Sequence, residues 1–228
     1  MGGIGKQSGF SVILDSKHED RTILNSKGCS DDLKLKDVTL KPTKWFYVSS
    51  MMKHSFKTTI SILKKSKSKV AYNPSLYQAK LGYKKLKPML DQVDILIFNK
   101  EEAQALSNEQ DLNKAFKKLI NWVKQAVLIT DGKNGACFCD GKIFFHAKPK
   151  KNIKIVETTG AGDSFASGFV AGIASNKSIE DSLKMGLLNA ESVIQNYGAQ
   201  NILLSKTKMM QKLKNDKRKI IKEKRCLL

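Results

Sequence analysis

One stretch of the chain places an acid directly after small, flexible residues at the expected start of a helix. Residues 156–173 read VETTGAGDSFASGFVAGI, in which Gly160, Ala161 and Gly162 precede Asp163. Glycines at such a junction let backbone amides approach a ligand, and the positive end of a helix attracts an anion such as phosphate. Asp163 adds negative charge there, which is useful if it takes a proton from a hydroxyl that attacks the phosphate. The alternative is that Asp163 is simply an N-cap.

Two other stretches add polar groups that suit a nucleotide site. In VLITDGKNGA, Thr130, Gly132 and Gly135 follow an apolar run, so their amides and hydroxyl can meet the phosphate or ribose of a nucleotide. In IFNKEEAQAL, Asn99 ends an apolar run and Glu102 follows three residues later, at the edge where open α/β sheets bind ligands. This pair also has the spacing of a capping box. The two uses are compatible, because a carboxylate there can hold a water of hydrated Mg²⁺.

Short apolar runs that alternate with helical segments must position these residues. Four runs have the character of strands: WFYVSS, KVAYN, VDILIF and AVLIT. The clearest helix between them is expected from about Asp111 to Gln125, where apolar residues form one stripe. Apolar strands that alternate with helices predict a parallel sheet covered by helices on both faces.

Two hairpins and two late helices complete the expected elements. FSVIL and RTIL flank the polar turn DSKHED, and GACFCDGKIFFHA predicts a second hairpin through Asp140 and Gly141. Consecutive helices are expected over Asp163–Ala174 and Ser178–Tyr197, the second closed by Gly198.

Length and composition indicate an ordinary folded protein. The 228 residues are 41% hydrophobic and 27% charged, which is typical of globular domains. No apolar run approaches the roughly 18 to 20 residues needed to span a bilayer, and the amino terminus lacks a basic-then-apolar signal pattern. We therefore expect a cytoplasmic protein without a transmembrane segment.

The carboxyl-terminal segment carries much of the formal net charge of +20. Residues 206–225 hold ten Lys or Arg against two Asp or Glu, which gives +8. The whole chain has only Arg21, Arg218 and Arg225 as arginines, although the guanidinium fork is the group that best reads phosphates and base edges. We therefore expect no specific nucleic-acid partner, and a basic tail that is either a solvated terminal helix or frayed. The alternative is a basic amphipathic helix that touches RNA or an anionic membrane.

Taken together, the motifs resemble one enzyme family. In order and spacing, the chain resembles the PfkB carbohydrate kinases, the ribokinase-like kinases, through ETTGAGDSFASGFVAGI, FNKEEAQAL, VLITDGKNGA, YNPSLYQAKLG and LLNAESVIQNYGAQ. The resemblance covers about residues 8–205, so we expect a kinase domain over 1–205 and a Lys-rich tail over 206–228. It implies a three-layer α/β/α sandwich with a mostly parallel central sheet and a small β lid. The implied activity is ATP-dependent transfer of the γ-phosphoryl group to a primary hydroxyl of a sugar or nucleoside.

The resemblance also implies roles for individual residues. Asp163 would be the general base for the acceptor hydroxyl, and residues 160–162 would form the anion hole over the γ-phosphate. Asn99 and Glu102 match a motif implicated in handling Mg²⁺ and phosphate. The residues implied to contact ATP are Thr130, Gly132, Gly135 and Asn189.

Two features depart from the family pattern. Glu157 stands where the family usually has Asp, in a neighbourhood that often binds a monovalent cation such as K⁺. The chain also shows no match to the family's first strands, so we expect the amino-terminal strands and the lid to be incomplete. Three hypotheses follow. The chain is a fragment of a family kinase or has a start that is assigned too late, it is a truncated nucleotide-binding homologue with weak or no catalysis, or it is a basic protein that binds RNA or membrane surfaces through its tail. The resemblance is also compatible with a homodimer.

Overall fold

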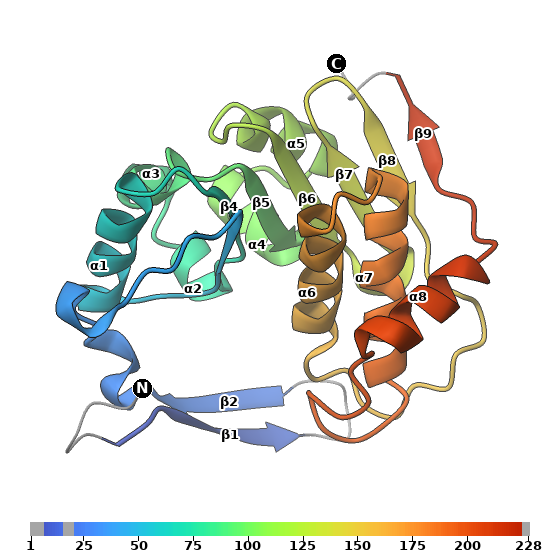
Figure 1. Cartoon of the computed structure of the whole chain (residues 1–228), viewed down its shortest axis with the longest axis horizontal. Coiled ribbons are helices and arrows are strands. Elements are labelled where there is room, and N and C mark those ends of the chain that lie inside the picture. The colour runs from blue at the N-terminus through green and yellow to red at the C-terminus, as the bar shows by residue number, and fades with distance from the viewer. Residues whose placement is uncertain (1–6, 16–20, 225–228) are drawn as a thin grey trace. The chain divides into compact units, whose positions relative to one another are not determined.

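The chain folds into two compact units (Figure 1). The computed structural model describes residues 7–15 and 21–224. One unit comprises Met1–Thr43 and Ser50–Lys67, and the other comprises Lys44–Ser49 and Ser68–Leu228. The residues with candidate chemistry all belong to the second unit.

The smaller unit contains the first predicted hairpin. β1 (Phe10–Asp15) pairs antiparallel with β2 (Arg21–Ser26), which confirms this prediction. The polar turn expected between the strands falls mainly on residues 16–20, outside the described part of the chain.

A helix and two 3₁₀ turns complete the smaller unit. α1 (Lys53–Lys64) follows η1 (Gly28–Asp31) and η2 (Leu35–Asp37) along the chain. The buried hydroxyl of Ser55 donates a hydrogen bond of 2.7 Å to the carbonyl of Ser30. This bond attaches the first turn of α1 to η1.

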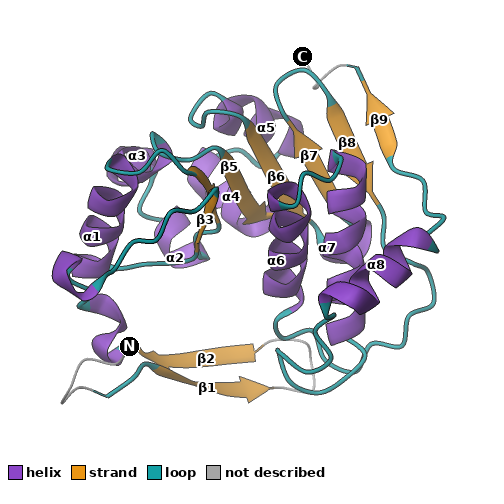
Figure 2. Ribbon diagram, in the orientation of Figure 1, coloured by secondary structure: helices purple, strands orange, loops and turns teal. Residues whose placement is uncertain are grey.

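The larger unit is built on a seven-stranded sheet with the order β3-β4-β5-β6-β7-β8-β9 (Figure 2). The first four strands are parallel: β3 (Trp45–Val48), β4 (Lys69–Tyr72), β5 (Ile95–Asn99) and β6 (Ala126–Thr130). The other three are joined antiparallel: β7 (Ala136–Cys139), β8 (Phe144–Ala147) and β9 (Ile221–Glu223). The four parallel strands and the second hairpin confirm the predictions, whereas β9 was not predicted.

Helices cover both faces of this sheet (Figure 1). One group follows the first strands along the chain: α2 (Leu76–Ala79), α3 (Tyr83–Leu90), α4 (Lys100–Ser107) and α5 (Leu112–Ile120). The other group follows β8: α6 (Ala161–Ala174), α7 (Ile179–Val193) and α8 (Lys206–Lys214). Several ends differ from prediction, because α5 stops at Ile120, α6 already starts at Ala161 and α7 stops at Val193.

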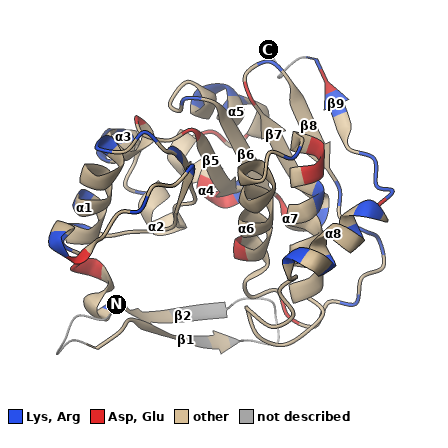
Figure 3. Cartoon of the chain, in the orientation of Figure 1, with Lys and Arg blue, Asp and Glu red and all other residues tan. Residues whose placement is uncertain are grey.

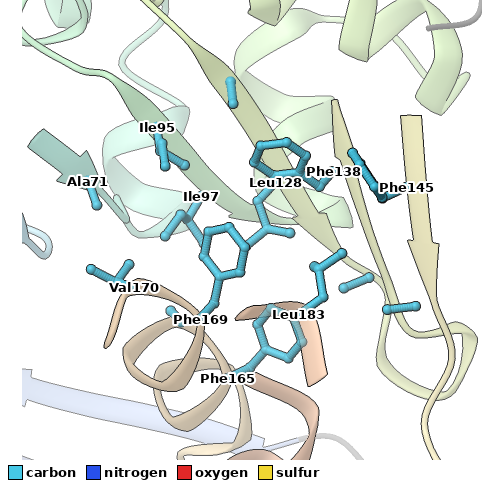
Figure 4. Packing of buried hydrophobic residues seen from close by; sticks show 14 of the residues in the cluster. Ala71, Ile95, Ile97, Leu128, Phe138, Phe145, Phe165, Phe169, Val170 and Leu183 are labelled. Carbon is cyan, nitrogen blue, oxygen red and sulfur yellow. The ribbon is translucent and has the colours of Figure 1, made fainter. Parts of the chain in front are cut away.

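The core between α6, α7 and the sheet determines where the amino end of α6 lies (Figure 4). Phe165 and Phe169 of α6 and Leu183 of α7 pack with Ile97 and Leu128 of the sheet, and all five side chains are buried. Burying a side chain of this size stabilises a fold by about 1.5 to 3 kcal/mol. The orientation of α6 on the sheet is therefore strongly constrained.

Glycines allow α6 and α7 to approach each other closely. A Cβ on Gly168 would lie 2.8 Å from the carbonyl oxygen of Met185, and one on Gly172 would lie 2.6 Å from Oγ of Ser182. No side chain fits at these distances, which explains why small residues recur in the ASGFVAGI segment.

The basic carboxyl-terminal segment is folded onto the larger unit through one apolar face and one strand. Met209 of α8 is buried with Met185 and Leu188 of α7. β9 pairs with β8 and lies at the edge of the sheet. Figure 3 shows Lys and Arg along α8 and the segment that leads to β9. The expected terminal helix is present as α8 with its lysines exposed, but the described part of the segment is not frayed, because it also packs on α7 and pairs with β8.

An ion-pair network further attaches this segment. Nη1 and Nη2 of Arg218 donate to the two carboxylate oxygens of Glu191 at 2.9 and 2.8 Å, and Nε donates to Asp216 at 2.7 Å. The three side chains are between 1% and 9% exposed. Two of the paired groups lie within the segment and one lies on α7, so the network links the segment to the helix.

Candidate active site

The carboxyl ends of β5 and β6 bring two of the predicted site residues side by side. Asn99 and Thr130 are direct partners in the parallel register of these strands. Oδ1 of Asn99 accepts from the amide of Glu102 at 2.8 Å, and Oε2 of Glu102 accepts from the amide of Asn99 at 2.9 Å. The predicted capping box at the start of α4 is therefore confirmed, and it fixes the Glu102 carboxylate beside the end of β5.

The environment of Glu102 disfavours its charged form. Partial burial raises the pKa of this carboxyl group to about 6, and the charges of Glu101 and Asp163 act in the same direction. Hydrogen bonds from the amides of Asn99 and Leu76 partly offset the rise. A carboxylate that is ionised at neutral pH in spite of two acidic neighbours is a good partner for a cation.

The glycines after β6 form a tight turn. The amide of Asp131 donates to the carbonyl of Gly135 at 2.8 Å, and Oγ1 of Thr130 donates to the carbonyl of Phe98 at 3.3 Å. Gly135 has a φ of 95°, and a Cβ there would overlap the carbonyl of Ala147. Only glycine fits this position, so the TxGxxG spacing has a structural reason as well as the implied nucleotide role.

The lysine that follows Asn99 is paired across the same two loops. Nζ of Lys100 lies 3.5 Å from a carboxylate oxygen of Asp131, and both side chains are partly exposed. This weak pair links the start of α4, directly after β5, to the loop after β6.

The amino end of α6 differs from the alternative in which Asp163 is its N-cap. Gly160 is the N-cap, with a φ of 78°, and Asp163 is the third residue of the first turn. A Cβ on Gly160 would lie 2.7 Å from the carbonyl oxygen of Ala199, whereas a Cβ on Gly162 would meet nothing within 4 Å. Gly160 is thus required by the fold, and Gly162 lies beside open space.

Asp163 lies close enough to two strand ends for its charge to act on groups there. Its charge contributes to the raised pKa of Glu102 after β5 and to the raised pKa of Tyr47 on β3. The structure therefore brings Asp163, Asn99, Glu102 and Thr130 to one edge of the sheet.

Asn189 stabilises the first turn of α6 through two hydrogen bonds. Its Nδ2 donates to the carbonyl of Ser164 at 2.8 Å, and its Oδ1 accepts from the amide of Leu204 at 3.1 Å. Asn189 is 6% exposed. Since Ser164 follows Asp163, the amide of Asn189 braces the first turn of α6 against the loop before α8.

Glu157 links the segment before α6 to the loop after α7. Its Oε2 accepts from the amide of Gly198 at 2.8 Å, and its own amide donates to the carbonyl of Ile194 at 3.2 Å. Ala199, whose carbonyl crowds Gly160, lies in the same loop. The longer side chain at position 157 thus helps to hold the loop that packs on the N-cap of α6.

Sequence reasoning missed Tyr47 and Asn73 at this edge. Tyr47 lies on β3, and Asn73 directly follows β4 and hydrogen-bonds to the Tyr47 hydroxyl. Both positions meet the rule that identified Asn99, because ligands of open α/β sheets bind outside the carboxyl ends of the strands.

The oxygen donors at this edge of the sheet suit a magnesium ion whose other ligands are water and nucleotide phosphates. Among residues 7–15 and 21–224, no group of three or more His, Cys, Asp or Glu side chains is arranged to hold a metal ion. Mg²⁺ commonly takes one or two protein carboxylates and completes its shell with water and nucleotide phosphates. Glu102 is a carboxylate of this kind, and the side chain of Asn99 lies beside it. None of the helices in the same described residues has both the length and the apolar character needed to cross a membrane.

Solved structures share this fold. A ribokinase from Thermotoga maritima aligns over 92% of this chain and 71% of its own, with a TM-score of 0.76 and 22% identity. A nucleoside kinase from Methanocaldococcus jannaschii aligns over 93% and 70%, with a TM-score of 0.77 and 18% identity. These similarities establish a ribokinase-like α/β sandwich, as predicted.

Curated sequences give the more specific relationship. A cytidine kinase of Thermococcus kodakarensis is 30% identical over 157 residues, which are 68% of this chain and 56% of the relative. A ribokinase of Lactococcus lactis is 32% identical over 151 residues, which are 66% of this chain and 47% of the relative. The chain thus spans about half the length of these two relatives. Residues 5–206 match the pfkB family carbohydrate kinases, and the chain belongs to that family.

Proposed function

We propose that this protein transfers the γ-phosphoryl group of ATP to a primary hydroxyl of a sugar or nucleoside. The observation that carries the proposal is the position of Asp163 in the first turn of α6, beside a glycine N-cap and within electrostatic reach of Glu102. The names of the relatives, cytidine kinase and ribokinase, support an acceptor that contains a ribose-like polyol.

In this proposal Asp163 accepts the proton of the acceptor hydroxyl as its oxygen attacks the phosphorus. The amides of residues 160–162 lie at the positive end of α6, where they stabilise the charge of the transferred group. Phosphoryl transfer depends mainly on positioning and charge stabilisation. The buried packing of α6 on the sheet supplies the rigidity that such positioning needs.

Glu102 and Asn99 would hold a hydrated Mg²⁺ at the end of β5. When bound, this ion neutralises charge on the nucleotide phosphates. The raised pKa of Glu102, about 6, supports this role, because a cation removes the repulsion from Asp163 that contributes to the shift. A monovalent cation such as K⁺ is proposed near Glu157, and replacement of K⁺ by Na⁺ or Li⁺ in the assay tests it.

The turn after β6 would contact ATP. Thr130, Gly132 and Gly135 lie where the loops after β5 and β6 are joined through Lys100 and Asp131. Asn189 contributes through the first turn of α6, whose carbonyl at Ser164 it binds. Because ATP and Mg²⁺ are abundant in the cytoplasm, a cytoplasmic site of action is part of the proposal.

A labelling assay tests this function. The chain is incubated with Mg²⁺ and ATP labelled with ³²P at the γ position, and with ribose, cytidine, adenosine, 2-dehydro-3-deoxygluconate or fructose 6-phosphate in turn. Label in the phosphorylated acceptor is the expected result. A rise in melting temperature with MgATP but no transfer to any acceptor would instead support a nucleotide-binding homologue without catalysis. If MgATP causes no shift in melting temperature and no acceptor is labelled, the proposal is overturned.

A further inference from the structure

Tyr47 lies on the sheet face that α6 covers. It is the direct register partner of Ala71 on β4, which in turn partners Ile95 on β5. Ala71 and Ile95 belong to the core that packs against α6, and Trp45, two residues before Tyr47, packs against the same core. Since alternate residues of a strand share a face, the Tyr47 side chain points to the side of the sheet that carries α6.

Tyr47 nevertheless extends beyond that core. It is 40% exposed, whereas Ala71 is fully buried and Ile95 is 3% exposed. A tyrosine near the carboxyl end of a strand, on a covered face and still open to solvent, presents its hydroxyl at the edge where the candidate site lies.

The hydroxyl of Tyr47 is oriented by the neighbouring strand. The side chain of Asn73 hydrogen-bonds to it, and the amide of Asn73 donates to the carbonyl of Val48 at 2.8 Å. The backbone of Asn73 is therefore fixed to β3, and its amide group holds the phenol from one side.

The surroundings of the phenol favour its protonated form. Partial burial, followed by the charges of Asp163 and then Glu102, raises the pKa of Tyr47 to about 12, and the hydrogen bond with Asn73 acts in the opposite direction. The phenol cannot act as a base at neutral pH. It is a hydrogen-bond donor beside the two carboxylates of the proposed reaction.

We propose that Tyr47 is an acceptor-binding residue, whose O–H group donates to a second hydroxyl oxygen of the sugar or nucleoside, other than the primary hydroxyl that is phosphorylated. This inference rests on the proposed function. Asp163 then takes the proton of one acceptor oxygen while Tyr47 donates to a second. A polyol with two oxygens close together meets both groups, whereas a simple alcohol meets only Asp163. The pair thus selects the chemical class of acceptor.

The test compares the protein with Tyr47→Phe, which removes one oxygen atom and keeps the ring. Steady-state kinetics are measured with cytidine and with ribose, using the better acceptor for the full comparison. We expect the acceptor KM to rise about 3- to 10-fold, the effect of losing one neutral hydrogen bond. The KM for ATP should stay within about twofold, because nucleotide contacts are elsewhere. Tyr77→Phe is the matched control, since Tyr77 is 65% exposed on α2 and no change is expected there.

Deoxy acceptors provide a second measurement that does not depend on how well a variant folds. With the unmodified protein, the analogue that lacks the contacted oxygen, 2′- or 3′-deoxycytidine for cytidine, should lose as much kcat/KM as the Tyr47→Phe change does. The variant and the analogue together should lose no more than either alone, because they remove the same contact. Additive losses, an unchanged acceptor KM or equal changes in both KM values would overturn the inference while leaving the kinase function intact. Failure of the unmodified protein to phosphorylate any acceptor would overturn both.

Discussion

Two carboxylates with different surroundings lie at the edge of the sheet. Glu102 is partly buried and capped, and its pKa is raised to about 6, while Asp163 stands in the first turn of α6 beside glycines. Active sites that give two carboxyl groups different roles commonly place them in different environments. The proposed division of labour, with Asp163 for the proton and Glu102 for the cation, follows from these environments.

The Glu102→Gln change separates stability from function. The raised pKa means that ionising Glu102 costs the folded state more than the unfolded state, so this group destabilises the fold as pH rises through about 6. Gln keeps an oxygen that can accept from the amide of Asn99 and removes the charge. We expect the variant to be more stable by about 1 kcal/mol at pH 8, with no gain below pH 4.5. Urea denaturation at the two pH values measures this difference.

Activity should change in the opposite sense. Loss of the cation partner should raise the Mg²⁺ concentration for half-maximal activity by about tenfold or more. Glu101→Gln is the control, since Glu101 lies in the same turn without the capping contact. A variant that is less stable at pH 8 and has an unchanged Mg²⁺ requirement would contradict the assignment.

For individual residues, the spacing between them in the sequence predicted more of the site than residue type alone. Asn99 and Glu102 were predicted as a capping box because Glu102 lies three positions after Asn99, and the bonds are present. The N-cap alternative for Asp163 was wrong, because a left-handed glycine, Gly160, takes the cap position. Tyr47 was not predicted, since its place beside Asp163 depends on strand order, which no local pattern contains.

The amino end of α6 makes a prediction that two adjacent glycines can test. Gly160→Ala should destabilise the protein by about 1 to 3 kcal/mol, because its φ is 78° and the new Cβ would meet Ala199. Gly162→Ala should be neutral or stabilising by up to about 1 kcal/mol, since a Cβ there has open space in a helix. Thermal or urea denaturation measures both.

The rate of phosphoryl transfer should depend on the absence of a side chain at Gly162. Gly162→Ala should lower kcat by about tenfold or more without loss of stability, because its methyl group would stand beside the amides that receive the phosphate. Gly168→Ala is the comparison for packing alone, since that glycine contacts Met185 and not the site. Full activity in Gly162→Ala would contradict the proposed anion hole.

Elements with strong periodic patterns were predicted, and those set by long-range pairing were not. The four parallel strands are apolar runs with β5 and β6 almost fully buried, so their character is local. β9 has only exposed residues, and it forms because it pairs with β8, far away in the sequence. α7 ends before the predicted Tyr197, since the following loop instead packs on Gly160 through Ala199.

In the whole molecule, not every basic side chain of the carboxyl-terminal segment is a free surface charge. The net charge is +20, yet Arg218 is committed to Glu191 and Asp216 inside the fold. An arginine held in this way cannot contact phosphates of a nucleic acid. The lysines of α8 are exposed, whereas Lys222 of β9 lies 3.6 Å from a carboxylate oxygen of Glu180.

The Arg218→Ala change tests how the segment is attached. Truncation leaves the carboxylates of Glu191 and Asp216 buried without their partner, so we expect a loss of about 3 kcal/mol in the free energy of unfolding. Lys219→Ala, next to it and exposed, should change stability by less than about 0.5 kcal/mol. Equal stability of the two variants would contradict the network. Tight, salt-sensitive RNA binding that Lys219→Ala weakens would favour the alternative function.

The central claim is that Asp163 is the base of a phosphoryl transfer. The most direct test compares Asp163→Asn with the same change at an acidic residue in a matched position. Asp181 occupies the same third position in the first turn of α7, so Asp181→Asn loses the same interaction with a helix end. Transfer of γ-phosphate to the best acceptor is measured at saturating MgATP. We predict that Asp163→Asn lowers kcat by about 10²- to 10⁴-fold while Asp181→Asn does not. A kcat of Asp163→Asn within about tenfold of the unmodified protein would contradict the account.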